Sequence, residues 1–264
     1  MHLSALYLYP IKSLAGIAVR QAELTARGLR HDRRWMLVRP DGTFITARRY
    51  PQLVLLQPSL RGDDLLITHR QRDLLPLEVP GEPETDETMM VEVWGDRVRA
   101  QLVSPLVDAW FSEQLGTACH LVYMPESTRR RVDGRYARQG EVVSFADGYP
   151  YLIIGESSLA DLNARLDRPV DMRRFRPNLV VAGGAPYAED HWQRFRVGAV
   201  EFAAVKPCAR CVLTTVDPDT GQPGKEPLAT LASYRSRRNK VLFGMNLLAP
   251  EHGTLRVGDP IAVG

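Results

Sequence analysis

The sequence contains little cysteine and no strong excess of charge of either sign. Three cysteines stand among 264 residues, an odd number that argues against a disulfide framework and fits a reducing compartment such as the cytoplasm. The formal net charge of +3 is too small to indicate a nucleic-acid-binding protein by itself. The first residues show neither a basic region nor a long apolar segment, so no signal peptide and no membrane span are expected.

The remaining composition is that of an ordinary globular protein, with 44% hydrophobic and 25% charged residues. Short apolar runs alternate with turn residues roughly every ten positions, a spacing typical of an all-β sandwich or barrel. Strands are predicted over residues 3–9, 16–24, 35–39, 44–47, 53–60, 64–69, 90–93, 152–154, 179–182, 195–205 and 241–248, with a final hairpin over 253–263.

Helices are expected in three places. The clearest follows Ser104 and Pro105, because Val107, Phe111 and Leu115 recur at helical spacing and residue 116 is a glycine suited to end it. Shorter helices are predicted over residues 158–166 and 225–235. The chain is therefore predicted to be mainly β with a few helices, long enough for one large or two modest domains.

The most distinctive segment is residues 205–221, which contains Cys208 and Cys211 with Lys206 and Arg210 beside them. Neighbouring cations favour the thiolate, which is the form that acts as nucleophile or metal ligand. Residues 212–216 are rich in β-branched side chains and are predicted to form a strand. At least one of the two cysteines is therefore a candidate for chemistry.

Several interpretations of the two thiols stay open at this point. A zinc site needs about four ligands, and Cys119 with His120 lies far away in the sequence. A thioredoxin-like dithiol needs a helix after the cysteine pair, which the predicted strand does not provide. One thiolate could instead bind a soft metal carried by a cofactor while the other only packs nearby, or both could be buried structural thiols.

Basic and polar side chains gather in other loops. The loop at residues 10–16 offers Lys12 and Ser13, as an anion cradle or as an ordinary solvated loop. Asp32 among arginines indicates an ion network that holds a guanidinium in place. Residues 171–178 bring three arginines and Asn178, donors that suit a phosphate or a ring edge. Pro177 should hold the preceding Arg176 extended, so only some of these arginines could reach one ligand.

A further stretch over residues 126–138 is rich in arginine and poor in apolar side chains. It is predicted to be a solvated loop, with a docking surface for an acidic redox partner or a lid over the site as alternatives.

Motifs along the whole chain resemble the MOSC family, named after the molybdenum-cofactor sulfurase C-terminal domain. In the second half these are the cysteine stretch with Asp217-Pro-Asp-Thr-Gly221, the run Arg174-Phe-Arg-Pro-Asn178 and the ending Val257-Gly-Asp-Pro260. Upstream, Tyr9-Pro-Ile-Lys-Ser13, Asp32-Arg-Arg-Trp35 and Thr46-Ala-Arg48 resemble the β-barrel domain that precedes MOSC in the amidoxime-reducing components. The resemblance implies two β-barrel-like regions, an N-terminal domain over residues 1–120 and a MOSC domain over 121–264.

The resemblance also implies a molybdenum–pterin cofactor, the molybdenum cofactor, in which one cysteine thiolate binds the metal. The position that matches the family's metal ligand is Cys211, and Cys208 is then a neighbour. The cofactor-binding positions of the family fall on Lys12, Ser13, Arg33, Arg174, Arg176, Asn178, Arg210 and Cys211.

The activity implied is the reduction of small N-hydroxylated compounds such as amidoximes, a detoxification reaction in which the metal takes oxygen from an N–OH group. Because no cysteines remain for an iron–sulfur domain, electrons are expected from a separate ferredoxin, b-type cytochrome or flavin reductase. The alternatives are a carrier of the cofactor or of sulfur without turnover, and a binding module that has lost its metal. A cytoplasmic monomer without nucleic-acid or membrane partners is expected.

Overall fold

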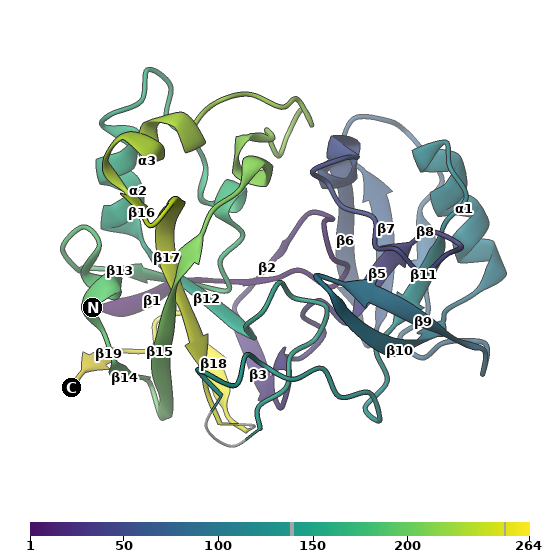
Figure 1. The fold of residues 1–264 in the computed structure, drawn as a ribbon, viewed down its shortest axis with the longest axis horizontal. Helices are drawn as coiled ribbons and strands as arrows, with labels where there is room; N and C mark the ends of the chain where they lie inside the picture. Colours follow the sequence, from purple (N-terminus) through teal and green to yellow (C-terminus); the bar gives the residue numbers. More distant parts are fainter. Residues whose placement is uncertain (138–139, 251) are drawn as a thin grey trace.

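The computed structural model describes residues 1–137, 140–250 and 252–264. Strands dominate these ranges and three short α-helices accompany them, so the prediction of a mainly β protein with a few helices is confirmed. The strands form two lobes that lie side by side (Figure 1). None of the helices in the described ranges has the length and hydropathy needed to cross a membrane.

The larger lobe is built around a nine-stranded sheet of order β19-β14-β15-β17-β12-β13-β1-β2, with β16 paired to β17. Only β12 and β13 run parallel, and α2 (Glu156–Asn163) lies between them in the chain as the crossover that parallel strands need. The strand bounds are β1 (His2–Leu8), β2 (Ile17–Val19), β12 (Tyr151–Gly155), β13 (Leu179–Ala182), β14 (Arg194–Val197), β15 (Val200–Ala209), β16 (Ser236–Arg237), β17 (Lys240–Leu248) and β19 (Ile261–Val263).

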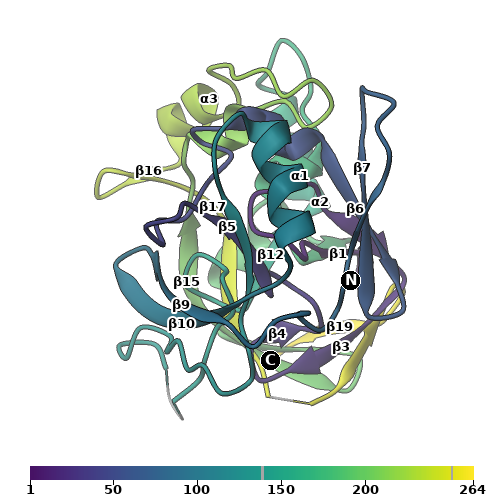
Figure 2. The ribbon, with the colours of Figure 1, turned by 90° about the vertical axis from the view of Figure 1, so that its right-hand side faces the viewer.

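The smaller lobe combines a four-stranded sheet of order β5-β11-β10-β9 with a three-stranded sheet of order β6-β7-β8. Their bounds are β5 (Trp35–Val38), β6 (Leu56–Arg61), β7 (Asp64–His69), β8 (Leu77–Val79), β9 (Thr88–Val93), β10 (Asp96–Leu102) and β11 (His120–Tyr123). The predicted helix is α1 (Pro105–Leu115), labelled in Figure 2. It buries Val107, Phe111 and Leu115 in the core of this lobe. Gly116 ends it in the left-handed conformation, with φ 65°.

Shorter elements complete the fold. A second three-stranded sheet, β18-β3-β4, is made of β3 (Gln21–Thr25), β4 (Gly28–Leu29) and β18 (Thr254–Arg256). The helix α3 (Leu228–Tyr234) packs against β17, within the predicted range 225–235. The 3-10 helices are η1 (Pro51–Leu55), η2 (Met172–Phe175), η3 (Ala188–His191) and η4 (Val212–Thr215).

Several local predictions are wrong. The segments 16–24 and 195–205 are not single strands, because the chain divides them into β2 and β3 and into β14 and β15. Residues 44–47 form no returning strand, because the chain makes one bridge at Phe44 and then buries Ile45 and Ala47 as irregular structure. The strand predicted over 53–60 begins only after η1, which starts at a proline. Residues 212–216 form the helix η4 instead of a strand. The last two strands do not pair as a hairpin, since β18 pairs with β3 and β19 with β14.

The chain crosses between the lobes at its start. β1 pairs with β13 from His2↔Ala182 to Leu6↔Leu179, so the first strand belongs to the large sheet. The loop between β1 and β2 reaches into the smaller lobe, where Ile11 and Leu14 join its core. After β2 the chain returns to the larger lobe, where Ala22 and Leu24 of β3 are buried. The division into domains of residues 1–120 and 121–264 stays a prediction.

The prediction that residues 126–138 form a solvated loop is wrong at Arg130, which is buried. Only 3% of Arg130 is exposed. Its guanidinium donates to the carbonyl oxygens of Ser144 and Ala146, and its Nε lies 2.8 Å from a carboxylate oxygen of Asp96. The neighbouring Arg129 and Arg131 are exposed, as predicted, and Arg138 lies outside the described residues. One arginine of the cluster therefore ties the connecting segment to β10 and to residues 144–146.

Replacing Arg130 tests this role. Arg130→Met keeps an apolar stem but leaves the buried carbonyls of Ser144 and Ala146 without their donor. We expect the free energy of unfolding to fall by about 3 kcal/mol, measured by urea denaturation. Arg129→Met is the matched control and should change it by less than about 0.5 kcal/mol. Equal losses in both variants would contradict a specific role for Arg130.

Candidate functional site

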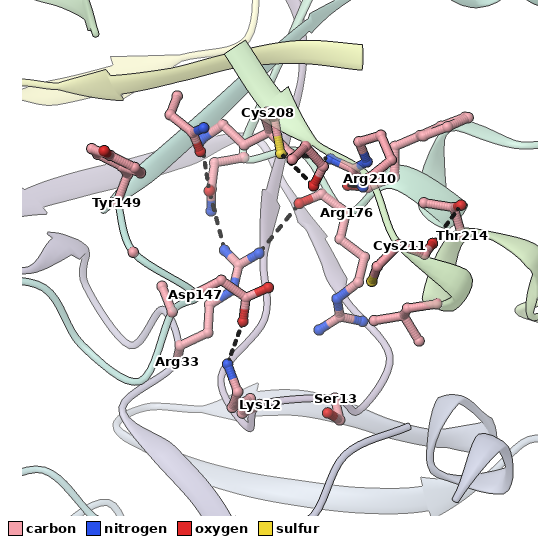
Figure 3. Close-up of a pocket in the computed structure, with 18 of the residues that line it drawn as sticks. Lys12, Ser13, Arg33, Asp147, Tyr149, Arg176, Cys208, Arg210, Cys211 and Thr214 are labelled. Carbon is pink, nitrogen blue, oxygen red and sulfur yellow. Dashed lines mark hydrogen bonds and ion pairs between the residues drawn. The ribbon is translucent and has the colours of Figure 1, made fainter. Parts of the chain in front are cut away.

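An open cleft lies at the junction of the two lobes, and residues from both lobes line it. Every residue that the family resemblance assigned to the cofactor lines it: Lys12, Ser13, Arg33, Arg174, Arg176, Asn178, Arg210 and Cys211. These side chains come from segments far apart in the sequence, and Figure 3 shows six of them, Lys12, Ser13, Arg33, Arg176, Arg210 and Cys211, around one space. The structure therefore brings the assigned residues together, and their roles as cofactor ligands stay a proposal.

Lys12 forms the floor of the cleft. It follows β1 in a tight loop in which the next residue, Ser13, has a φ of 75°. The Lys12 Nζ donates to the carbonyl oxygen of Phe145 at 2.8 Å and to a carboxylate oxygen of Asp147 at 2.6 Å. Burial lowers the pKa of Lys12, and the carboxylate of Asp147 opposes that shift. The first loop is thus a built cationic position rather than an ordinary solvated loop.

The ion network predicted around Asp32 is present. Asp32 is 1% exposed and accepts from the backbone N–H of Tyr9 at 2.9 Å and from the guanidinium of Arg33. Arg33 also donates to the side-chain oxygen of Asn178 at 3.1 Å and to the carbonyl oxygen of Arg176 at 3.2 Å. Because Arg33 has these fixed acceptors, its guanidinium is held in one orientation at the wall of the cleft.

The two arginines of the second cluster differ in their partners. Arg174 forms an ion pair with Asp217 at 2.7 Å and donates to the carbonyl oxygen of Thr215. Arg176 donates to the carbonyl oxygen of Leu14 at 2.6 Å and lies over the Tyr9 ring at 4.2 Å. No carboxylate in the described part of the chain pairs with Arg176. Burial and the nearby Arg33 lower the pKa of Arg176 to about 10.

The backbone of Arg176 overturns one prediction. Its φ of 56° and ψ of 46° are left-handed and not extended, even though a proline follows. This conformation ends η2, and the Arg176 N–H bonds back to the carbonyl oxygen of Arg173. The chain then enters β13, and both Arg174 and Arg176 line the cleft.

The cysteines lie at the end of β15. Arg210 donates from one guanidinium nitrogen to the Cys208 sulfur at 3.0 Å and from another to the carbonyl oxygen of Phe175 at 2.6 Å. Cys208 therefore holds Arg210 in place as well as packing nearby. Cys211 precedes η4 and its thiol points into the cleft (Figure 3). Among the described residues, no three His, Cys, Asp or Glu side chains gather as a metal site, so the zinc interpretation lacks a ligand set.

The donors in the cleft fit an anionic cofactor. Its cations are Lys12, Arg33, Arg48, Arg174, Arg176 and Arg210, and Asp147 is the carboxylate among the described lining residues. The Nε of Arg210 and the hydroxyls of Tyr149 and Tyr151 are buried and have no hydrogen-bond partner within the described ranges. Burial raises the pKa of Tyr149 to about 12, so its hydroxyl keeps its proton at neutral pH. A phosphate and a polar ring edge would satisfy such donors, and the Cys211 thiol adds a soft metal ligand.

Sequence reasoning missed part of this lining. Asp147 and Tyr149 lie in the loop before β12, Tyr151 is the first residue of β12, and Asn246 lies on β17. Arg48 belongs to the Thr46-Ala-Arg48 motif but was not assigned to the site. The signal available was the polar run Asp147-Gly-Tyr-Pro-Tyr151 directly before a buried strand, a place where loops carry function.

The two parts of the chain match two family models. Residues 1–118 match the MOSC N-terminal beta barrel domain, and residues 140–262 match the MOSC domain. The chain is 38% identical to mitochondrial amidoxime-reducing component 1 of Homo sapiens, over 97% of this chain and 81% of the relative. It is 36% identical to the human amidoxime reducing component 2, over 97% and 81% respectively. The molybdenum cofactor sulfurase of Oryza sativa is 36% identical, over 94% of this chain and 32% of that protein.

The fold and its cleft define a MOSC protein with both a MOSC N-terminal and a MOSC domain, and at this level of identity and coverage the chain belongs to the family of the amidoxime-reducing components. The resemblance inferred from the motifs is confirmed.

Arg176 provides a test of the cleft without its ligand. Burial disfavours the charged form of Arg176 and lowers its pKa in the folded protein to about 10. Below about pH 10 the side chain is charged in both the folded and the unfolded protein, so its burial reduces the free energy of unfolding. This loss of stability becomes smaller as the pH rises through the pKa of the folded protein, because the buried side chain then loses its charge. Arg176→Met should therefore raise the melting temperature of the cofactor-free protein by roughly 3 °C at pH 8. The difference should shrink above pH 10, as scanning calorimetry can show. A lower melting temperature for the variant at pH 8 would contradict the idea.

Proposed function

We propose that this protein is a molybdenum-cofactor-dependent reductase of small N-hydroxylated compounds, such as amidoximes. The observation that carries the proposal is the convergence of the family-matched residues on one cationic cleft into which the Cys211 thiol points. Relatives named amidoxime-reducing components support it, since they align along nearly the whole chain. When bound, the cofactor supplies the two-electron removal of oxygen from an N–OH group.

The chain's own residues would bind and orient that cofactor. Cys211 is the proposed metal ligand, and Lys12, Ser13, Arg33, Asn178 and Arg210 supply charge and hydrogen bonds. Between the two arginines of the second cluster, Arg176 is the stronger candidate for direct binding. The donors of Arg174 are already engaged by Asp217 and Thr215, whereas Arg176 has no counter-ion among the described residues.

The substrate and the electron donor follow from the same proposal. The cleft is open, so a small N-hydroxylated molecule can approach Cys211 directly. The donor is proposed to be a separate protein, a ferredoxin, b-type cytochrome or flavin reductase. The cytoplasm stays the proposed compartment, in keeping with the free thiols of Cys119, Cys208 and Cys211, and a monomer the proposed state.

A second candidate is a carrier of molybdenum cofactor or of sulfur that has no turnover of its own. The similarity to the plant protein named molybdenum cofactor sulfurase favours it, because that similarity covers 94% of this chain. The cysteine and the cations would serve either role. The two candidates differ in whether a loaded protein turns over substrate.

Metal analysis combined with an assay decides between them. The protein is produced in a host that makes molybdenum cofactor, its metals are quantified, and reduction of benzamidoxime is followed with reduced viologen as the chemical donor. About one molybdenum per chain with turnover is the expected result. Metal without turnover would favour the cofactor carrier, and zinc or no metal would overturn both the reductase and the cofactor carrier.

The cysteines provide the sharpest variants. Cys211→Ser should abolish turnover and most of the bound molybdenum, because it removes the proposed soft ligand. Cys208→Ser keeps an acceptor for Arg210 at nearly the same place, so both quantities should fall less than about threefold. Metal content by mass spectrometry and the viologen assay measure the two effects. Equal losses from the two substitutions would point to a dithiol or a zinc site.

A further inference from the structure

A two-stranded hairpin beside the cleft exposes cations that form no interaction within the described chain. It consists of β16, the start of β17 and the turn between them, in which Arg238 and Asn239 have φ of 50° and 59°. Residues 236–240 are all exposed. The side chains of Arg237, Arg238 and Lys240 have neither an ion pair nor a hydrogen bond to the residues described, and we call these three the cationic tip.

The pairing within this hairpin is unfavourable for folding. Arg237 lies directly opposite Lys240, and like charges opposite each other destabilise an antiparallel pair. Elsewhere the surface strands combine opposite signs. Arg97 faces Glu92 across β9 and β10, and Arg194 forms an ion pair with Glu201 at 2.7 Å. The cationic tip thus lacks the compensation found on other strands, which indicates a role other than stability.

The position of the tip connects it to the site. β17 pairs with β15 up to Ala209↔Leu242, and the backbone N–H of Arg210 donates to the carbonyl oxygen of Val241 at 2.8 Å. The hairpin therefore continues from the strand pair that carries Cys208 and leads to Cys211. Val212, next to Cys211, is 55% exposed. Figure 2 shows β16 and the turn between β9 and β10 projecting from the same side of the molecule.

The turn between β9 and β10 adds an aromatic side chain to this side. Trp94 is 42% exposed, its ring is covered by the guanidinium of Arg48 at 3.9 Å, and its indole N–H donates to Asp147 in the cleft. A partner that approaches from this side meets exposed cations together with the exposed apolar side chains of Val212 and Trp94. An acidic protein surface is complementary to that combination.

We propose that the cationic tip docks a small acidic electron-transfer protein, which delivers electrons at the Cys211 end of the cleft. This inference rests on the proposed reductase function. Reduction of R–NH–OH breaks its N–O bond and consumes two electrons and two protons to give R–NH₂ and water. The electrons come from two successive encounters, each of which oxidises one donor molecule by one electron, and the protons come from solvent.

Charge reversal at the tip is the test. The double variant Arg237→Glu/Arg238→Glu places a carboxylate opposite Lys240, which should keep the hairpin folded because the pair then has opposite charges. The control is Arg20→Glu/Arg256→Glu, which changes two exposed cations at the neighbouring strands β3 and β18, drawn at the bottom of Figure 1 away from β16. Both variants are prepared with molybdenum cofactor bound. Their turnover is measured with one of two electron donors, an acidic [2Fe–2S] ferredoxin with its reductase or reduced viologen.

The expected outcome is specific to the protein donor. For the tip variant, kcat/KM for ferredoxin should fall at least about tenfold at low salt, while viologen-driven turnover stays within about twofold of the parent. The parent's ferredoxin rate should decline with added salt and the variant's should not. The control variant should behave like the parent with both donors.

Other outcomes overturn the inference in distinguishable ways. Unchanged ferredoxin kinetics in the tip variant, or equal losses in the control, would exclude the tip as the docking surface. If kcat/KM for ferredoxin falls only when Arg129 and Arg131 are replaced by glutamate, the docking surface is the arginine-rich segment 126–138 and not the cationic tip. Retained ferredoxin turnover with lost binding to anionic vesicles would assign the tip to a membrane. If the parent turns over with viologen but not with ferredoxin or an acidic b-type cytochrome, the docking inference fails, and if it turns over with neither, the proposed function fails.

Discussion

Positive charge gathered at the junction of the two lobes is the constraint on which the rest of the structure depends. Placing cations close together in a partly desolvated cleft is unfavourable, because burial and mutual repulsion both disfavour the charged forms. Arg33 is compensated by the buried Asp32, Lys12 by Asp147 and Arg174 by Asp217. Arg48, Arg176 and Arg210 have no ion pair with a carboxylate among the described residues, and burial and the nearby Arg33 lower the pKa of Arg176. A bound anion would offset this unfavourable burial of charge.

The surrounding fold serves to hold those groups still. Loops that would otherwise be free are tied down by buried polar side chains, such as Arg130 on the carbonyl oxygens of Ser144 and Ala146. The last turn before Cys211 is fixed through Arg210, which bridges Cys208 and the carbonyl oxygen of Phe175. The sheets provide rigid ends to which short loops are attached, so that a site assembled from distant segments keeps a single geometry.

The sequence predicted what depends on local pattern and on motif. The strands near β1, β7 and β13 and the helix α1 followed from hydrophobic period and end signals, and the motif residues all reached one cleft. The predictions that failed concern features fixed by contacts between residues far apart in the sequence. Nothing near residues 254–263 shows that β18 and β19 join different sheets, and nothing near Arg130 distinguishes it from its exposed neighbours. The left-handed Arg176 contradicted its own local preference because the end of η2 and the cleft together fix it.

The first strand of the chain has a consequence for how the molecule is assembled. β1 lies between β13 and β2 in the large sheet, and His2 pairs with Ala182, so its neighbour on one side appears only after most of the polypeptide has been made. Contacts of such separation require closure of a long loop, which slows folding. During synthesis on the ribosome, the N-terminal segment must therefore wait unpaired on that side. The cationic floor at Lys12, attached to the end of this strand, can reach its final position only late in the process.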